Sequence, residues 1–226
     1  MLELIQPISK RDQVVRAMKE AILSGTIAPG ASIVESKIAQ QLGAGVPLIR
    51  EALIELEHQG FVQRTPYKGT TVTTLSPADV RHIFALRVEL EALAIEWAKE
   101  HATEADLESL RHEIRKMSDA AKALDLPQFY EGDLAFHRKI WSLSGNPYLV
   151  DALERLVVPL FAFFLMQTSR QQASYVNSAC MHAKIVDAMP AKSGVELREM
   201  FKESLINWKD DMVLLLFAEE AADGRS

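Results

Sequence analysis

The chain has 226 residues, of which 48% are hydrophobic and 25% are charged. This composition excludes general disorder, because there is enough apolar surface to build a core. The single cysteine, Cys180, excludes an intramolecular disulfide framework, and we expect it to be a buried apolar side chain. The N-terminal segment does not have the pattern of a signal peptide. The longest apolar run, 157–166, is too short to span a bilayer, and we expect Pro159 to interrupt it. We therefore expect a cytoplasmic protein without a membrane partner.

The formal net charge of −6 is unevenly distributed along the chain. Residues 1–75 contain eight Lys or Arg and seven Asp or Glu, so this part carries +1 and the remainder carries −7. An acidic body joined to a near-neutral head indicates two parts with different tasks.

The first 75 residues predict a helix-rich head that ends in a hairpin. Apolar residues recur at helical spacing in three segments, and two short β-branched or aromatic segments flank the turn 65–69. The expected elements, in order, are a helix from Ser9 to Gly25, a short strand at 32–34, a helix at 35–42, a helix from Pro47 to Gln59, and strands at 61–64 and 70–74. This order is typical of a winged helix-turn-helix, whose second paired helix enters the major groove of DNA.

A second domain is expected from residue 76 to residue 226. Ser76 and Pro77 are typical of a helix N-cap and first turn, and they open a long apolar helical pattern that includes Leu86. Every following segment has a helical pattern, which predicts six or seven helices and no strand. The fold class is therefore mainly α, with a winged head at 1–75 and an all-α bundle at 76–226.

Several short stretches resemble one family of bacterial proteins. In the head they are 22–30, 35–42, 50–53, Leu56, Glu57, Gly60, Gly69 and Val72; in the body they are Arg87, Glu91, 133–137, His182 and Ile185. With these residues the chain resembles the GntR superfamily of transcription regulators, in its FadR-like branch with an FCD effector domain. The resemblance covers nearly the whole chain. It implies an operator-binding head and a body that binds a small molecule and forms a homodimer.

The resemblance places the DNA-reading surface at the helix that begins near Pro47. Arg50 lies in its first turn, where a guanidinium can contact both O6 and N7 of guanine. Two departures leave this surface with fewer hydrogen-bonding groups than usual. Gly45 and Val46 stand where the family often has Ser or Thr followed by Arg, and Leu48 stands where the family has Pro. The residues expected to contact DNA are Val46, Pro47, Arg50, Arg64, Lys68 and Gly69, with the alternative that Arg50 only pairs with an acidic neighbour.

A candidate metal site lies in the body. Asp133 and His137 are four residues apart on one predicted helix, so both side chains point the same way. A carboxylate and an imidazole at this spacing can form half of a site for a divalent transition metal, with zinc or nickel as the first choices. The resemblance places a further ligand at His182. The other four histidines lie on charge-rich stretches and are expected at the surface: His58, His82, His101 and His112. The alternative is a structural hydrogen bond in a metal-free pocket.

The resemblance also indicates how an effector would bind. It implies that Arg87 faces the pocket and grips the carboxylate of a small carboxylic acid, while the alternative is a surface ion pair with Glu91. The usual third histidine of the family would fall near Ser204, which is a poor metal ligand. Asn207, one turn beyond Ser204, is a candidate to supply an oxygen.

The sequence leaves three functions to compare. The first is a ligand-responsive DNA-binding regulator that acts as a repressor. It would bind operator DNA as a homodimer, because one head has too few cations to bind DNA tightly. The second is a metal-dependent enzyme that uses Asp133, His137 and His182. The third is a regulator whose head binds DNA weakly, as Gly45 and Val46 would allow.

Overall fold

The structure is a computed structural model that describes residues 9–168 and 172–223, and the side chains of residues 9–168 and 175–208. The chain divides into two compact units, Met1–Thr74 and Leu75–Ser226. The sequence pattern also predicts a helix break at 169–174, of which residues 169–171 lie outside the described residues. Among the described residues, no helix is long and apolar enough to cross a membrane.

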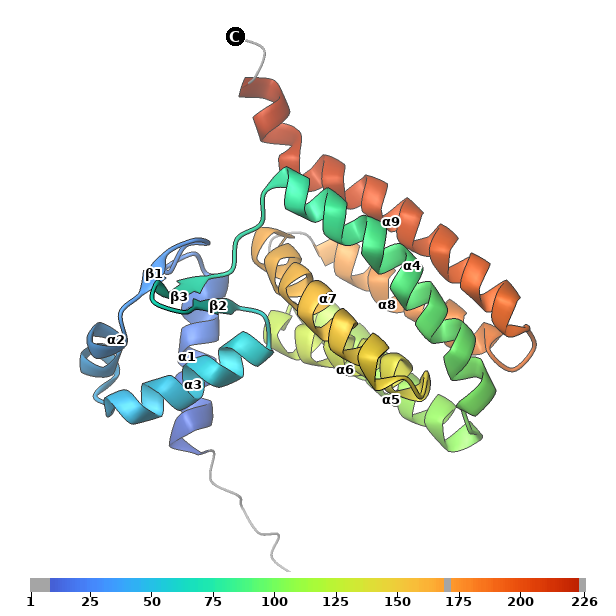
Figure 1. Ribbon diagram of the computed structural model, residues 1–226, viewed down its shortest axis with the longest axis horizontal. Coiled ribbons are helices and arrows are strands. Elements are labelled where there is room, and N and C mark those ends of the chain that lie inside the picture. The colour runs from blue at the N-terminus through green and yellow to red at the C-terminus, as the bar shows by residue number, and fades with distance from the viewer. Residues whose placement is uncertain (1–8, 169–171, 224–226) are drawn as a thin grey trace, which may run out of the picture. The chain divides into compact units, whose positions relative to one another are not determined.

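The first unit contains three helices and a small sheet in the expected order (Figure 1). Its elements are α1 (Lys10–Leu23), β1 (Ser32–Ile33), α2 (Glu35–Leu42), α3 (Val46–His58), β2 (Val62–Thr65) and β3 (Gly69–Val72). The sheet is antiparallel in the order β1–β3–β2, so the hairpin of β2 and β3 forms the wing.

The turn between α2 and α3 depends on glycine. Gly43 adopts a left-handed conformation with φ of 60°, which ends α2 and turns the chain toward α3. Gly45 is the N-cap of α3 and, having no side chain, gives no capping hydrogen bond there. Helix α3 then buries Ile49, Leu53 and Leu56 in the core of this unit, which leaves its opposite face exposed.

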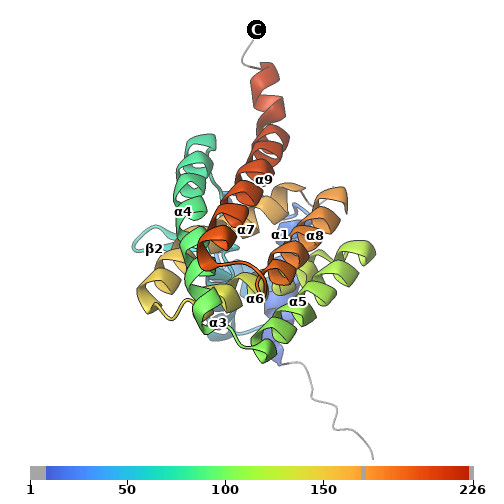
Figure 2. The same cartoon turned by 90° about the vertical axis from the view of Figure 1, so that its right-hand side faces the viewer.

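The second unit is all-helical among the described residues (Figure 2). Its helices are α4 (Pro77–His101), α5 (Glu104–Ala123), α6 (Leu126–Leu143), α7 (Pro147–Thr168), α8 (Gln172–Ala188) and α9 (Gly194–Asp223). Ser76 caps α4 through a reciprocal capping box with Asp79. Helix α4 packs against α6, α7 and α9, while α5 packs against α6 and α8. The predicted fold class is confirmed.

One glycine sets the position of α6, the helix that carries Asp133 and His137. A Cβ atom at Gly132 would lie 2.7 Å from Cγ of Met117 on α5, closer than two such atoms can approach. Gly132 therefore allows α6 to lie close against α5 and fixes the depth at which Asp133 enters the bundle.

Three expectations about burial or helix breaks were wrong. Cys180 is exposed, because it lies on the outer face of α8. Leu86 in α4 is 52% exposed, although its place in the apolar pattern predicted burial. Pro159 does not interrupt the apolar run, since α7 continues through it and buries most of that run. A helix surface of this size often leaves single apolar residues exposed.

Candidate functional site

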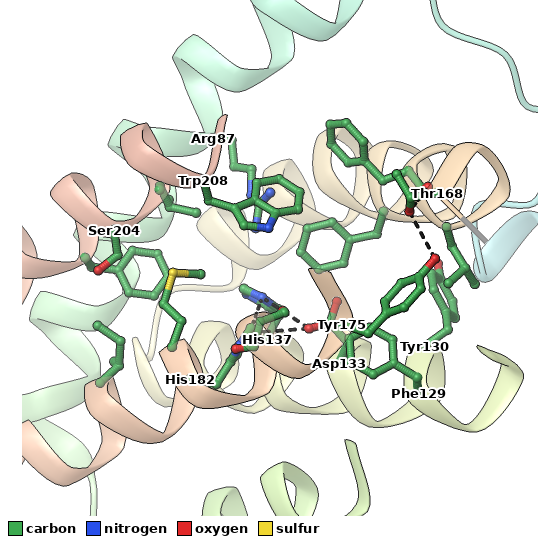
Figure 3. A pocket seen from close by; sticks show the side chains of 18 residues that line it. Arg87, Phe129, Tyr130, Asp133, His137, Thr168, Tyr175, His182, Ser204 and Trp208 are labelled. Carbon is green, nitrogen blue, oxygen red and sulfur yellow. Dashed lines mark hydrogen bonds and ion pairs between the residues drawn. The ribbon is translucent and has the colours of Figure 1, made fainter. Parts of the chain in front are cut away.

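A cavity lies inside the helical unit, between α4, α6, α7, α8 and α9 (Figure 3). The cavity and its opening together contain about 770 Å³ of empty space, part of which is open solvent. Its walls are mostly aromatic and aliphatic, with a small group of ionisable side chains: Arg87, Asp133, His137 and His182. A largely apolar cavity with a few converging polar groups is typical of a small-molecule site.

The structure brings Asp133 and His137 of α6 together with His182 of α8. Nε2 of His137 lies 3.0 Å from Nε2 of His182. Oδ1 of Asp133 lies 3.3 Å from Nε2 of His182 and 4.0 Å from Nε2 of His137. His182 is 45 or more positions away from the other two residues in the sequence. The three residues nevertheless present three metal-ligand atoms to one point.

Hydrogen bonds fix which nitrogen of each histidine carries the proton. Nδ1 of His137 lies 2.7 Å from Oε1 of Glu91, and Nδ1 of His182 lies 2.6 Å from the carbonyl oxygen of Ser178. Both partners can only accept, so both Nδ1 atoms donate and both Nε2 atoms present lone pairs. Burial also lowers the pKa of His182 to about 4, so its imidazole is neutral at pH 7.

The donor set fits a divalent metal ion. Three atoms with these separations can all lie about 2 Å from one point, which is the usual distance from zinc to imidazole nitrogen or carboxylate oxygen. Oδ1 of Asp133 is buried and has no hydrogen-bond donor among the described residues, so its negative charge faces the cluster without a proton. Two lone pairs and a carboxylate repel one another unless a cation lies between them.

Glu91 of α4 supports both the cluster and Arg87. Its Oε1 accepts hydrogen bonds from Nδ1 of His137 and, at 3.0 Å, from Nε1 of Trp141, and its Oε2 lies 2.7 Å from Nε of Arg87. Burial raises the pKa of Glu91, but Arg87 and His137 lower it further, to about 2. Glu91 is therefore a permanently ionised carboxylate that orients a ligand histidine, as outer carboxylates often do in metal sites.

Arg87 is buried and lines the cavity, so its pair with Glu91 is not on the helix surface. Its guanidinium carbon lies 4.4 Å from the ring centre of Phe161 and 5.3 Å from that of Trp208. These rings hold the guanidinium in place by cation–π contacts. Nη1 of Arg87 is buried without a hydrogen-bond partner among the described residues, which leaves a donor for an anion.

The structure separates the two remaining effector candidates. Ser204 lines the cavity, and its hydroxyl donates to the carbonyl of Met200 at 2.9 Å. Asn207 is exposed and is not part of the cavity wall, so the expectation that it supplies an oxygen there was wrong. On α9 the cavity wall continues from Ser204 through Leu205 and Trp208, and Asn207 lies between these two on the exposed side of the helix.

In the head, Arg50 lies exposed at the start of α3. Its Nε lies 2.6 Å from Oε2 of Glu35 on α2. The acidic neighbour is thus in the preceding helix, where the alternative for Arg50 named Glu51, Glu55 or another acidic residue. An exposed pair of this kind contributes little stability, so Arg50 can leave Glu35 at small cost when DNA is present. Val46 and Pro47 lie beside Arg50 in the first turn of α3.

The wing presents exposed residues at its tip. Lys68 and Gly69 are exposed there, and Arg64 on β2 lies 3.9 Å from Glu57, a weak ion pair. Tyr67, which sequence reasoning missed, is fully exposed and has a positive φ of 64°. A residue with a large aromatic side chain rarely adopts a positive φ. In this turn conformation the side chain of Tyr67 is exposed beside Lys68.

Glu91 was also undervalued, since the sequence analysis gave it as a residue that carries the family resemblance and as a surface partner of Arg87, but not as a partner of His137. Its spacing of four from Arg87 on a helix with apolar neighbours could have indicated a buried pair. Its contacts with His137 and Trp141, which are about 50 residues away, carry no signal in one sequence.

Comparison with known proteins agrees with this arrangement. Residues 10–72 match the family described as bacterial regulatory proteins, gntR family, and residues 82–207 match the FCD domain. The chain belongs to the GntR-family regulators that carry an FCD domain. The relatives of this GntR-family protein are transcription regulators, so the alternative of a metal-dependent enzyme was wrong.

Two curated relatives and one solved structure illustrate the similarity. The regulator McbR of Escherichia coli K12 is 30% identical over 65% of this chain and 66% of its own length, so the chain spans just under two thirds of that relative. A probable D-xylose utilization operon repressor of Paenarthrobacter nicotinovorans is 28% identical over 75% of this chain and 74% of its own. The solved structure of McbR/YncC is 24% identical, covers 95% of this chain and 100% of its own, and has a TM-score of 0.68, which shows a shared fold.

Proposed function

We propose that this GntR-family protein is a ligand-responsive transcriptional repressor in the cytoplasm. The head binds operator DNA, and the helical unit binds a small carboxylic acid through a divalent metal ion and Arg87. The observation that carries this proposal is the convergence of Asp133, His137 and His182 next to the buried, unpartnered Nη1 of Arg87. The relative named as a D-xylose operon repressor supports the direction of regulation.

Asp133, His137 and His182 would hold the metal ion, and zinc or nickel suits this donor set. Three protein ligands leave coordination positions open, so the bound ion would supply an electrophilic site for a carboxylate oxygen. Glu91 keeps the His137 ring in orientation, and Nη1 of Arg87 donates to the same anion. The aromatic walls exclude water from these contacts and thereby strengthen them.

The head supports DNA binding in a homodimer. Arg50, in the first turn of α3, would contact guanine, with Val46 and Pro47 beside it. Arg64, Lys68 and Gly69 would lie along phosphates at the wing. Because each head carries few cations, two heads on a near-palindromic operator release twice as many counterions as one head.

Effector binding would regulate the heads through linkage. A ligand changes DNA affinity only to the extent that it binds one arrangement of the dimer more tightly than the other. Repression is then relieved when the carboxylate favours the arrangement that fits the operator less well.

The experiment uses the full chain and the DNA that flanks its own gene. Fluorescence anisotropy at two salt concentrations should show saturable, salt-sensitive binding, and sedimentation should show a dimer. Metal-loaded protein with an added carboxylate should release the DNA, whereas the His182→Ala variant should bind DNA but ignore the carboxylate. DNA binding without any salt dependence, or release from the His182→Ala variant equal to the wild type, would contradict the proposal.

A further inference from the structure

Two helices run along the cavity wall between the metal cluster, called here the polar end, and the Thr168–Tyr175 pair, called the far end. On α7, Phe161 lies 4.7 Å from the ring of His137, and Thr168 lies at the other end. On α8, His182 belongs to the metal cluster, while Tyr175 contacts Thr168. Each pair of residues is seven positions apart, so the ends are separated by about 10 Å at 1.5 Å per residue. In Figure 3, Thr168 lies to the right of the two histidines and Ser204 lies to their left.

Among the described residues that line the cavity, charged side chains occur only at the polar end. Arg87 and Asp133 are the charged side chains that line it, and Glu91 lies directly behind them. Arg87 balances Glu91, a histidine that binds a metal ion does so as a neutral imidazole, and Asp133 contributes one carboxylate. A divalent ion would bring the total to +1, which one carboxylate neutralises.

Among the described residues, the far end offers neither a cation nor a spare proton from its paired hydroxyls. The hydroxyl of Thr168 donates to the carbonyl of Phe164 at 2.7 Å. The hydroxyl of Tyr175, 3.0 Å from Oγ1 of Thr168, must therefore donate to that oxygen. Burial raises the pKa of Tyr175 to about 12, so the phenol stays protonated. The ring of Phe129 packs on Tyr175, with centroids 4.9 Å apart, and closes this end with apolar surface.

We infer that the effector is a monocarboxylate with an apolar tail, rather than a di- or tricarboxylate. This inference rests on the proposed function and specifies its ligand. The carboxylate lies at the metal cluster and Arg87, and the tail extends along the face of α7 formed by Phe161, Leu165 and Thr168. The available length of about 10 Å corresponds to an extended chain of about eight carbon atoms.

A second carboxylate is disfavoured on electrostatic grounds. At the far end it would be removed from water without a cationic partner among the described lining residues. An unpaired buried carboxylate is so costly that it either takes up a proton or does not enter. An apolar tail, by contrast, gains free energy in proportion to the surface it buries against the aromatic walls.

The test measures binding to the zinc-loaded full-length protein by isothermal titration calorimetry. Octanoate and suberate (octanedioate) are the matched pair, because they have the same chain length and differ by one carboxylate. We expect octanoate to bind at least 10-fold more tightly than suberate or citrate. From butyrate to octanoate, the affinity should rise about fourfold for each added methylene. Octanol, which lacks the carboxylate, should bind more weakly than octanoate.

A variant pair locates the tail. Leu165→Ala should weaken octanoate binding several-fold and leave acetate binding unchanged, while Leu86→Ala, the same substitution at an exposed position of α4, should change neither. Circular dichroism confirms that both variants are folded. Tighter binding of suberate or citrate than of octanoate, or affinity independent of chain length, would overturn this inference and leave the proposed function standing. Failure of every carboxylate to bind the zinc-loaded protein would overturn both, while DNA binding by the head remains a separate measurement.

Discussion

The Nε2 atoms of His137 and His182 face each other at 3.0 Å, while the Nδ1 atom of each ring lies against a hydrogen-bond acceptor. Their Nδ1 protons are committed to Glu91 and to the carbonyl of Ser178. Two lone pairs at this separation, with the carboxylate of Asp133 beside them, form an arrangement that a cation stabilises. The hydrogen bonds at Nδ1 therefore determine that each Nε2 is the nitrogen available to a metal ion.

Removal of one ligand should abolish tight metal binding. His182→Ala leaves two donors, and its affinity for zinc should fall by more than about 100-fold, which exceeds the usual loss when only a supporting residue is removed. Competition with a chelating dye measures this affinity. His112→Ala, at an exposed position of α5, is the matched control and should bind zinc like the wild type. Equal affinities of the two variants would exclude His182 as a ligand.

Glu91→Gln should weaken zinc binding indirectly. The amide can place its NH₂ group toward His137, which favours the wrong tautomer, so zinc affinity should fall by about 10- to 100-fold. The same chelator competition measures it. Glu100→Gln changes an exposed residue on the same helix and should have no effect. Unchanged affinity in Glu91→Gln would show that Glu91 serves only Arg87 and Trp141.

The stability of the metal-free protein should depend on pH through Glu91. Its pKa is about 2 in the folded chain and about 4.3 in an unfolded one, so its contribution is complete above pH 4.3 and disappears as the pH falls through 2. The difference in unfolding free energy between the wild type and Glu91→Gln, on the order of 3 kcal/mol, should shrink over this window. Urea denaturation at pH 6, 4 and 3, with chelator present, measures the difference. A difference that grows toward acid pH would refute the assignment.

Arg50→Ala tests the recognition helix. Loss of a contact to guanine should weaken operator binding by roughly 10- to 100-fold and relax the sequence preference. Anisotropy with the operator and with a scrambled duplex measures both effects, and Arg115→Ala, an exposed arginine of α5, is the control for charge. Unchanged operator affinity would mean that another surface reads the DNA, or that the head binds weakly because of Gly45 and Val46.

Lys68→Ala tests the wing in a different way. A lost phosphate contact should weaken binding about equally for all sequences and reduce the slope of log affinity against log salt by about 1 per head. Tyr67→Ala, at the adjacent position, removes no charge and should leave that slope unchanged. Equal slopes for the wild type and Lys68→Ala would place Lys68 away from the phosphates.

Helix boundaries were predictable because they depend on local chemistry. Ser76 caps α4 with Asp79, and Gly43 ends α2, and both signals can be recognised in the sequence. Exposure was harder to predict. Leu86 and Cys180 are exposed because burial depends on which neighbouring helices cover a given face, and one sequence does not specify that packing.

The candidate site was predictable only where its residues lie close together in the sequence. Asp133 and His137 share a helix face, so their spacing indicated them, whereas His182 followed from the family resemblance. The role of Glu91 depends on α4 lying against α6, and the length of the cavity depends on how α6, α7 and α8 align. These are tertiary contacts with no local pattern.

The position of Trp208 has a practical consequence. Its indole lines the cavity, 5.3 Å from the guanidinium of Arg87 and 5.1 Å from the ring of Phe164. A carboxylate that draws Arg87 away, or a tail that displaces water from the indole, alters the surroundings of the excited state. Intrinsic fluorescence can therefore report occupancy of the cavity in a titration that needs no label and no DNA.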